Sequence, residues 1–424
     1  MKRKIIQQLK LWKDNPARKP LILLGARQVG KTWVMKHFGL TEFENVAYIN
    51  CDVEPLAKEL FAADYNIPRI LLALQAITGT KIEAGKTLIV FDELQEVERG
   101  LHSLKYFQEN APEYHVMAAG SLLGITLGKG QSFPVGKVNV MHLYPMDFEE
   151  FLMAAGETDL CDLLHQPDWE ILKILSLKYI DLLRQYYYVG GMPEVVDCFF
   201  QHQNLQEVRD KQTEILDAYR RDISKHTTPT ESMRIGQVLQ SLPSQLAKEN
   251  KKFIYNVLKK GARSTEYELA IQWLMDAGLV HKVSRVKELQ MPVKFYEDLG
   301  AFKLFLLDCG LLGCMLVGDN VFKEFKGAFT EQFVLQQLVA QGFSPYYWSS
   351  DKTPAEIDFV VQTEHRVIPV EVKAEENVRA RSMSEYIKNH PDYQLRGLRI
   401  SMMGYQDQEW MENIPLFAIT KFFG

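Results

Sequence analysis

Short, mostly apolar runs recur along the first third of the chain, each followed by a turn or a polar residue. Runs of this kind are typical of strands that are buried on both faces of a parallel sheet. We expect such strands at four places: Leu21–Leu24, Val46–Asn50, Thr87–Phe91 and His115–Ala119. The residues Trp33–Phe38, which follow the first run, can continue a helix. The pattern therefore predicts an α/β domain with a parallel sheet.

The middle of the chain has mainly helical spacing. Apolar residues recur at helical intervals from about Trp169 to Arg221, with a break at Val189–Pro193, where glycines and a proline force a turn. We interpret this stretch as a helical lid over the preceding α/β domain. Three helices and a strand are expected next, at Met233–Leu242, Lys252–Lys260, Thr265–Ala277 and Leu279–Val283. This order is that of a winged helix, whose third helix can enter a DNA major groove.

Toward the C-terminus the pattern changes to an alternation of polar and apolar residues. Ala355–Gln362 and Ile368–Lys373 both begin in this way, and only a short segment separates them. We therefore expect an antiparallel hairpin. If its tip is Glu364-His365, Asp358 lies directly opposite Glu371, and paired side chains share one face of the ladder.

The phosphate-binding pattern G-x-x-x-x-G-K-[ST] is complete in the turn after the first apolar run. It comprises Gly25, Ala26, Arg27, Gln28, Val29, Gly30, Lys31 and Thr32. Backbone N–H groups of such a loop, at the N-terminus of a helix, form a nest for phosphate oxygens. Lys31 is expected to bridge the β- and γ-phosphates of a nucleotide, and the hydroxyl of Thr32 to ligate Mg²⁺.

Two acidic residues end the third apolar run. Asp92 is placed to hold the Mg²⁺ hydration shell, and Glu93 to orient and deprotonate an attacking water. A solvated strand end is the alternative, but the complete phosphate loop favours a hydrolytic pair. Ser121, at the end of the fourth run, is expected to lie beside the γ-phosphate and to sense its loss.

The C-terminal hairpin supplies a second candidate site. The period of two adds Lys373 to the face of Asp358 and Glu371. Such carboxylates bind Mg²⁺ or Mn²⁺, and the lysine can help to activate a metal-bound water. An amphipathic helix at Phe329–Leu335 would let Glu331 complete the metal shell. The alternative is a charged, solvent-facing side of an edge hairpin.

Composition bounds the class of protein. With 424 residues the chain exceeds the size of a single core. We divide it into an ATPase core (1–165), a helical lid (166–230), a winged helix (231–290) and a C-terminal α/β domain (291–424). Five cysteines without C-x-x-C spacing fit buried thiols in a reducing cytoplasm better than a disulfide framework or a zinc site. The basic residues at the N-terminus precede no apolar signal segment, and no run is long enough to span a membrane.

The charge distribution leaves DNA binding open. A net charge of −5 argues against indiscriminate coating of nucleic acid. The expected winged helix is locally basic, and its phosphate-contact candidates are Lys251, Lys252, Lys259, Lys260 and Arg263. Its third helix nevertheless carries Glu266, Glu268 and Asp276, which repel the DNA backbone. A scaffold role for this segment is the alternative.

These motifs resemble known families. Gly25–Thr32, Leu88–Glu93 and Ser121 resemble the Walker A, Walker B and sensor 1 elements of AAA-type ATPases. Asp358, with Glu371 and Lys373, resembles the PD-(D/E)xK motif of restriction-endonuclease-like proteins, and Glu331 matches the helical glutamate of that family. Ile357 stands where the proline of the motif would be.

The combination resembles a prokaryotic family in which an AAA core precedes a winged helix and a nuclease-like domain. The resemblance implies ATP binding. Two functions then remain: an ATPase that drives a metal-dependent nuclease, with DNA as target, or an ATP-dependent switch that keeps the nuclease fold for docking. Assembly into a homo-oligomer is compatible with either, and Arg184, Arg220 and Arg221 are candidates to reach a γ-phosphate. No protein partner is indicated, and no membrane association is expected.

Overall fold

The computed structural model describes residues 1–120, 134, 136–165, 168–248, 251–316, 326–374 and 380–423. The chain divides into two compact units. The first unit comprises Lys2–Tyr144 and Asp276–Leu279, and the second comprises Met1, Pro145–Met275 and Val280–Gly424. The first break thus falls after Tyr144, ahead of the expected boundary at residue 165. The segments expected as lid, winged helix and C-terminal domain belong together in the second unit.

The first unit is built on a parallel sheet of five strands in the order β2-β3-β4-β1-β5. The expected strands are confirmed, and β5 is added to them. The strands are β1 (Leu21–Leu24), β2 (Asn45–Asn50), β3 (Thr87–Asp92), β4 (His115–Ala119) and β5 (Asn139–His142). The helices are α1 (Ile5–Asp14), α2 (Lys31–Glu42), α3 (Pro55–Ala63), α4 (Ile67–Thr78) and α5 (Gly100–Asn110), with a 3₁₀ turn η1 (Leu94–Glu96).

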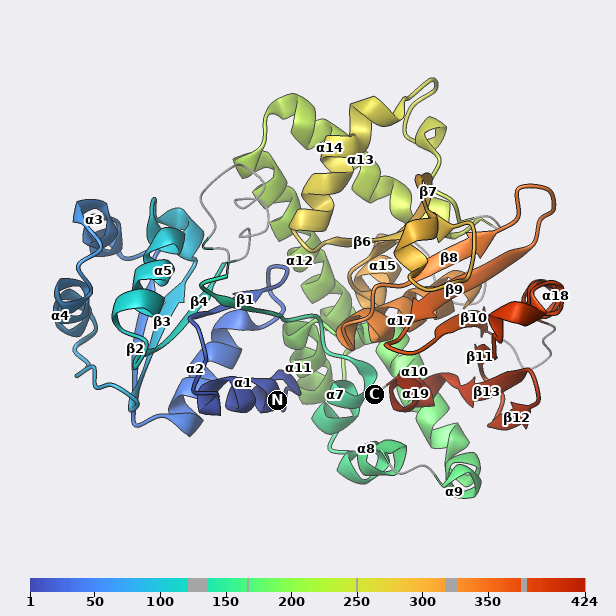
Figure 1. Cartoon of the computed structure of the whole chain (residues 1–424), viewed down its shortest axis with the longest axis horizontal. Helices are drawn as coiled ribbons and strands as arrows, with labels where there is room; N and C mark the ends of the chain where they lie inside the picture. Colours follow the sequence, from blue (N-terminus) through green and yellow to red (C-terminus); the bar gives the residue numbers. More distant parts are fainter. Residues whose placement is uncertain are drawn as a thin grey trace. The chain divides into compact units, whose positions relative to one another are not determined.

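Helices cover both faces of this sheet, which explains why its strands are apolar throughout (Figure 1). Alternate strand residues, such as Ile89 and Phe91, pack into one hydrophobic cluster with α3, α4 and α5. The intervening residues face α2, whose Gly39 lies so close to Leu88 and Val46 that an added Cβ would crowd both side chains. The sheet therefore holds the loop between β1 and α2 at its carboxyl edge, which is where nucleotides bind in open α/β sheets.

The second unit contains most of the helices. They are α7 (Phe148–Ala154), α8 (Thr158–His165), α9 (Trp169–Ile174), α10 (Ser176–Val189), α11 (Pro193–His202), α12 (Leu205–His226), α13 (Pro229–Leu246), α14 (Ser264–Asp276), α15 (Cys309–Met315), α17 (Lys326–Ala340), α18 (Arg381–Asn389) and α19 (Ile419–Phe423). Short 3₁₀ turns are η2 (Tyr255–Val257), η3 (Val293–Tyr296), η4 (Pro391–Tyr393) and η5 (Leu416–Ala418).

An eight-stranded mixed sheet, in the order β12-β13-β11-β10-β9-β8-β6-β7, organises the rest of this unit. Its strands are β6 (Val280–Val286), β7 (Glu297–Leu306), β8 (Tyr346–Ser349), β9 (Glu356–Gln362), β10 (Val367–Lys373), β11 (Gly397–Ser401), β12 (Gln406–Gln408) and β13 (Met411–Pro415). The strand expected as a wing is β6, which pairs with β7 and also with β8. The sheet therefore runs across the expected boundary at residue 290.

The prediction of a helix at Lys252–Lys260 was wrong. Only the single 3₁₀ turn η2 forms there. The backbone N–H of Phe253 donates to the carbonyl of Phe302 in β7 at 2.8 Å, and that of Ile254 donates to Oε1 of Gln245 at 2.7 Å. Because these partners lie outside the segment, its first residues are not helical: Phe253 bonds to β7, and Ile254 has an extended backbone. The flanking helices α13 and α14 are confirmed.

The helix α17 is buried along nearly its whole length, so the expectation of an amphipathic helix was also wrong. Its polar side chains bond to the backbone of neighbouring elements. Gln332 accepts from and donates to Leu306 (3.1 and 2.6 Å), and Gln337 accepts from the N–H of Phe148 at 2.9 Å. These contacts fix α17 against β7 and α7, and with it the direction in which Glu331 points.

The predicted turn after α10 has a steric cause. A Cβ on Gly191 would lie 2.1 Å from the carbonyl oxygen of Met146, and one on Gly190 would lie 2.2 Å from Oδ1 of Asp308. Oδ2 of Asp308 accepts a hydrogen bond from the N–H of Gly191 at 2.6 Å. The two glycines therefore let the buried carboxylate of Asp308 bind the turn directly.

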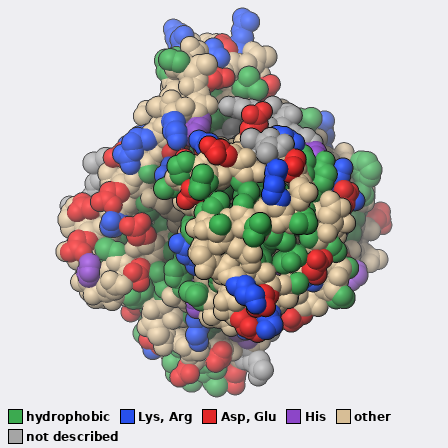
Figure 2. Space-filling view, turned by 90° about the vertical axis from the view of Figure 1, so that its left-hand side faces the viewer, with side chains coloured by type: hydrophobic (Ala, Val, Ile, Leu, Met, Phe, Trp, Pro, Cys, Tyr) green, Lys and Arg blue, Asp and Glu red, His purple; other side chains and the backbone are tan. Residues whose placement is uncertain are grey.

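The surface of the first unit is chemically mixed. Figure 2 shows hydrophobic side chains interspersed with basic and acidic ones on the side that carries α3 and α4. The exposed large apolar residues of this region include Val53, Leu56 and Leu72. Among the residues that the structure describes, no helix is long and apolar enough to cross a membrane.

Candidate functional sites

The loop Gly25–Thr32 has the backbone of a phosphate nest. Gly25, Gln28 and Gly30 all have positive φ, at 154°, 66° and 94°. A Cβ on Gly25 would lie 2.3 Å from the carbonyl oxygen of Leu143, so the loop can pass this strand end only with glycine. Gly30 precedes the first residue of α2, which places the loop N–H groups at the positive end of that helix. The site therefore has the shape that a nucleotide phosphate needs.

Lys31 lies folded into this loop. Its ammonium donates to the carbonyls of Gly25 (2.9 Å) and Ala26 (2.8 Å), and its side chain is almost fully buried. Burial lowers the pKa of Lys31 to about 8, although Glu93 and Asp92 favour its charged form. A phosphate would replace these carbonyls with charged acceptors and restore the ordinary preference for the ammonium form.

The two expected magnesium ligands lie together. The hydroxyl of Thr32 donates to Oδ2 of Asp92 at 2.6 Å. Both are oxygen ligands of the hard type that Mg²⁺ takes, one at the start of α2 and one at the end of β3. These residues fit a Mg²⁺ ion bound with a nucleotide.

Further residues orient the acidic pair. The hydroxyl of Tyr48 also donates to Oδ2 of Asp92, at 2.9 Å, and burial together with Asp92 raises the pKa of Tyr48. Gln95 Nε2 donates to Oε2 of Glu93 at 2.6 Å. Glu93 itself has positive φ, at 52°, so the chain turns sharply after β3.

Arg3 supports the loop from the N-terminus, a role that the sequence analysis missed. Its guanidinium donates to the carbonyls of Val29 (2.9 Å) and Tyr144 (2.7 Å), and it is 7% exposed. In the sequence Arg3 belongs to a basic cluster that resembles the start of a signal peptide. Only the fold brings it to a loop 26 residues away.

Two predictions about nucleotide sensing remain untested. Ser121 lies outside the described residues. Arg184 and Arg220 form ion pairs with acidic residues three positions earlier on their own helices, Asp181 at 3.0 Å and Asp217 at 2.7 Å. A role of these arginines, or of Arg221, at a γ-phosphate stays a prediction.

The second candidate site has the hairpin register expected from the sequence. Val367 pairs with Gln362 and Val370 pairs with Phe359 across β9 and β10, and the same register places Asp358 opposite Glu371. Oδ2 of Asp358 accepts a hydrogen bond from the backbone N–H of Val372 at 2.8 Å. The two carboxylates therefore lie on one face.

Lys373 and Glu331 join this face. Lys373 Nζ lies 2.6 Å from Oε1 of Glu371, two residues earlier on the same strand. Glu331, on α17, acts electrostatically on both Asp358 and Glu371, which places the helical carboxylate beside the hairpin pair. The structure thus brings together all four residues that the sequence proposed for this site.

Two lysines that the sequence analysis did not assign to the site complete it. Lys251 forms a close ion pair with Oε1 of Glu331. Lys303 is fully buried on β7, with Nζ 2.5 Å from Oε1 of Glu356 and 3.9 Å from Oε2 of Glu331. A lysine in the apolar run Ala301–Leu306 was the signal available in the sequence. Lys251 is paired internally, so it is not available for the DNA phosphate contact considered for it.

The pKa values of the three carboxyl groups in this cluster shift in different directions. Burial, with Glu331 and Glu371 nearby, raises the pKa of Asp358 well above its usual range. Burial opposes ionisation of Glu331 as well, but Lys251 and Lys303 outweigh it and lower the pKa of Glu331. Burial likewise raises the pKa of Glu371, against the influence of Lys373.

Two carboxylate oxygens of this cluster lack a hydrogen bond from any residue that the structure describes, although Lys303 lies 3.9 Å from one of them, Oε2 of Glu331. Among the described residues, none donates a hydrogen bond to Oε2 of Glu331 or to Oε2 of Glu371, and both atoms are buried. Buried acceptors of this kind are costly unless a donor or a cation satisfies them. Their carboxylate chemistry fits Mg²⁺ or Mn²⁺.

Comparisons with known proteins agree with the first site. Family profiles match three segments: "AAA domain" residues 17–152, "Domain of unknown function (DUF8612)" residues 180–321, and "Domain of unknown function (DUF4143)" residues 326–422. None of the curated proteins matches this chain in sequence. The AAA-domain match includes the phosphate loop, Asp92 and Glu93. The chain therefore carries an ATPase core of the AAA/P-loop type.

Solved structures show more distant similarity. The Walker-type ATPase PABY2304 of Pyrococcus abyssi is 13% identical, with 74% of this chain and 95% of that chain covered and a TM-score of 0.45. The ORC2 protein of Aeropyrum pernix, in ADPNP-ADP complexes, is 12% identical, with 77% and 93% covered and a TM-score of 0.35.

Proposed function

We propose that this protein couples ATP hydrolysis in its first unit to a metal-dependent nuclease centre in its second unit, which acts on DNA. The observation that carries the nuclease part is the convergence of Glu331, Asp358, Glu371 and Lys373 on one face, from a helix and two adjacent strands. This is the arrangement that the resemblance to restriction-endonuclease-like proteins requires.

In the first unit, the loop N–H groups and Lys31 bind the phosphates of ATP, while Thr32 and Asp92 hold Mg²⁺. When bound, Mg²⁺ neutralises charge on the phosphate oxygens. Glu93 orients a water for attack on the γ-phosphate and accepts its proton. Gln95 holds one oxygen of Glu93 and so limits its orientations.

In the second unit, Asp358, Glu371 and Glu331 would hold Mg²⁺ or Mn²⁺, and the bound ion would supply Lewis-acid chemistry for phosphodiester hydrolysis. Lys373 lies at the more open side of the site, with 31% of its side chain exposed against 8% for Glu371. It is therefore the residue of the four best placed to meet an incoming phosphate.

A second candidate function follows from the two additional lysines. Lys251 and Lys303 already compensate the charge of Glu331, and Lys303 also that of Glu356. A carboxylate cluster that internal ammonium groups neutralise gains less from a divalent cation. In this alternative the second unit is a docking module with a silent nuclease-like site, and ATP switches its binding to a partner.

A DNA-cleavage assay on the whole protein tests the proposal. The substrates are plasmid and single-stranded DNA, each with Mg²⁺ or Mn²⁺ and with or without ATP. The matched variants are Asp358→Asn for the second site and Lys31→Ala for the first. We expect cleavage by the wild type that requires a divalent cation and Asp358 and that changes with ATP. The Lys31→Ala variant should lose the effect of ATP alone.

The outcomes separate the two candidates. Cleavage that persists in Asp358→Asn would come from another centre or a contaminant and would overturn the nuclease proposal. If no substrate is cut under any condition while ATP is still hydrolysed, the docking function is the better one.

A further inference from the structure

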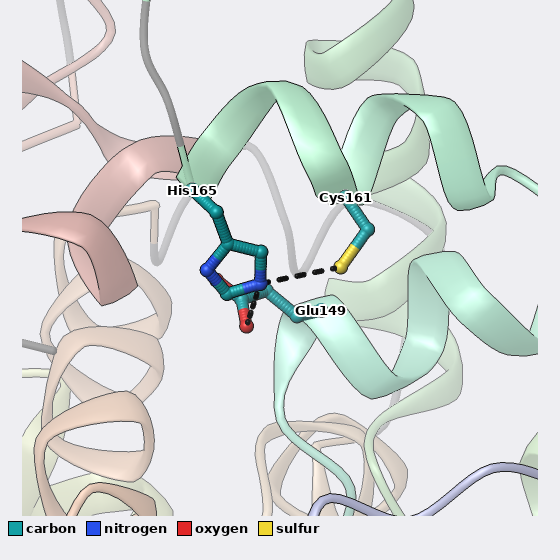
Figure 3. Close-up of side chains that lie close together, drawn as sticks. All are labelled: Glu149, Cys161 and His165. Carbon is teal, nitrogen blue, oxygen red and sulfur yellow. Dashed lines mark hydrogen bonds and ion pairs between the residues drawn. The ribbon is translucent and has the colours of Figure 1, made fainter.

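The second unit contains another cluster of metal-binding side chains, which uses none of the residues discussed above. Figure 3 shows Glu149, Cys161 and His165 turned toward one another, Glu149 from α7 and the other two from α8. We propose that these three side chains form a binding site for one zinc ion. This inference goes beyond the ATPase and nuclease functions and does not depend on either.

Local structure directs the three side chains to one point. Cys161 and His165 are four residues apart on α8 and therefore lie on the same face of that helix. Glu149 is in the first turn of α7, which a capping box between Asp147 and Glu150 holds in place. The neighbouring residue Leu160 accepts a hydrogen bond from the buried hydroxyl of Tyr179 at 2.7 Å, and this contact ties α8 to α10.

The distances suit a tetrahedral metal. Nε2 of His165 lies 3.6 Å from Oε2 of Glu149 and 4.0 Å from Sγ of Cys161, and all three ligand atoms lie within 4.8 Å of one another. Zinc with ordinary bond lengths and tetrahedral angles holds such atoms roughly 3.4–3.6 Å apart. The contacts to His165 therefore need to shorten by about half an ångström or less on binding, and the separation of the Glu149 and Cys161 ligand atoms, which is at most 4.8 Å, by up to about 1.3 Å.

The surroundings support the carboxylate as a ligand. The hydroxyl of Thr420 donates a hydrogen bond to Oε1 of Glu149 at 2.5 Å, while the other carboxylate oxygen, Oε2, lies toward His165. Outer hydrogen bonds of this kind orient the ligands of metal sites. The side chain of Glu149 is 2% exposed and that of His165 is 57% exposed. A metal here would have buried anionic ligands on one side and room for a water on the other.

The donor atoms select the metal. One thiolate, one imidazole and one carboxylate form a set that suits the borderline-soft Zn²⁺, whereas Mg²⁺ and Ca²⁺ take oxygen ligands alone. Three protein ligands leave a fourth position open. A bound zinc ion would also cross-link α7 and α8.

The chain offers a matched control. Cys198 and His202 on α11 have the same spacing, and Glu207 on α12 lies beside them. Here, however, Oε1 of Glu207 accepts from Asn204 at 2.8 Å and Oε2 contacts Nδ1 of His202 at 2.5 Å. The side chain of Glu207 is 44% exposed. We expect this second cluster to remain an ion pair at the surface.

Titration of EDTA-treated, nucleotide-free full-length protein with Co²⁺ tests the proposal. We expect one equivalent of Co²⁺ to produce a thiolate-to-cobalt charge-transfer band, which Zn²⁺ then removes by displacement. Cys161→Ser should abolish the band, and Cys198→Ser should leave it unchanged. The oxygen ligands proposed for the other two sites cannot produce this band.

Two more variants keep the test decisive. His165→Ala, at an exposed position, should keep the fold by circular dichroism and weaken Co²⁺ binding by at least tenfold. Thr420→Val should weaken it by roughly 10–100-fold through the lost outer hydrogen bond. Four outcomes would each overturn the zinc site in favour of an ion pair beside a buried thiol. They are absence of the band in the wild type, its survival in Cys161→Ser, its loss in Cys198→Ser, and unchanged Co²⁺ affinity in His165→Ala.

Discussion

The hydroxyl of Thr32 and Oδ2 of Asp92 are 2.6 Å apart, although 60 residues separate them in the chain. Thr32 lies in the first turn of α2, and Asp92 ends β3, which is not adjacent to β1 in the sheet. The two oxygens proposed as ligands of one Mg²⁺ ion thus lie side by side. The residues of this candidate site can be tested one at a time.

Lys31→Ala should abolish tight ATP binding. It removes the ammonium directed at the β- and γ-phosphates, and charge-assisted hydrogen bonds contribute about 1.5–3 kcal/mol each. We therefore expect the Kd for ATP to rise by roughly 100-fold or more in calorimetric titration. Lys86→Ala, at an exposed lysine paired with Glu44 at 3.3 Å, is the control and should bind normally. Unchanged affinity in Lys31→Ala would show that the phosphate loop is assigned wrongly.

Glu93→Gln should separate binding from hydrolysis. The amide keeps the shape of the side chain but cannot accept the proton of the attacking water. ATP should bind as in the wild type, while steady-state turnover falls by roughly 10²–10⁴-fold, as is typical when a general base is lost. Glu96→Gln, three residues further on, should turn over normally. A Glu93→Gln protein with wild-type turnover would place the base elsewhere.

Gly25→Ala should damage the same site through the backbone. The new Cβ would lie 2.3 Å from the carbonyl oxygen of Leu143, so the loop or the end of β5 must move. Gly85→Ala is the matched control, because Gly85 also has positive φ but no atom lies within 4 Å of its Cβ. The control should lose about 1–2 kcal/mol of unfolding free energy and keep its ATP affinity. Gly25→Ala should lose both more stability and ATP binding, as measured by denaturation and titration.

His115 should make the stability of the first unit depend on pH. Its ring packs against Trp12 and Phe43, and it is 6% exposed. Burial, assisted by Arg18, lowers its pKa to about 4. Below the unfolded pKa near 6.5 the unfolded chain takes up a proton that the native ring does not, so stability falls as the pH drops. Well above pH 6.5 the ring is neutral in both the folded and the unfolded chain, so it does not lower the unfolding free energy.

The size of this effect follows from linkage. Between pH 7 and pH 5 the difference in proton uptake lowers the unfolding free energy by about 2 kcal/mol. His115→Phe should remove this part of the pH dependence, because it leaves no group to titrate. Urea denaturation of both proteins at several pH values measures it. Parallel curves for the wild type and His115→Phe would contradict the low pKa of His115.

Local patterns predicted most of the first unit and the hairpin of the second. The strand before Gly25 and the alternation around Asp358 depend on near neighbours in the chain, so periodicity was sufficient. The hairpin register followed from its short turn, and it set Asp358 opposite Glu371 as expected. The placement of candidate carboxylates on neighbouring strands is therefore within reach of sequence reasoning.

Contacts between distant segments were not predictable in this way. Arg3 reaches the loop, and Lys251 reaches Glu331, only because tertiary packing brings these segments together. The non-helical backbone at Phe253 has the same origin, since its hydrogen bond to Phe302 overrides the helical pattern of the segment. Buried polar groups on α17 such as Gln332 likewise bond to other elements, which a simple amphipathic pattern does not represent.

The last prediction separates a metal-binding second site from a silent one. If Glu331, Asp358 and Glu371 hold a divalent cation, their mutual repulsion is relieved on binding. Mn²⁺ should then raise the melting temperature of the nucleotide-free protein. Asp358→Asn should remove this stabilisation and leave ATP turnover nearly intact.

Lys251→Met gives the sharper test, because it removes the ammonium that now pairs with Glu331 and retains much of the aliphatic packing. At a true cation site this change should raise Mn²⁺ affinity by at least roughly tenfold, since one nearby positive charge no longer opposes the metal. The free Mn²⁺ signal in electron paramagnetic resonance measures the affinity, and the double variant with Asp358→Asn is the control. If neither the wild type nor Lys251→Met binds Mn²⁺, the lysines serve as permanent counter-ions and the docking function is supported. Tighter binding in Lys251→Met that Asp358→Asn abolishes would instead identify Lys251 as a cation that competes with the metal for Glu331.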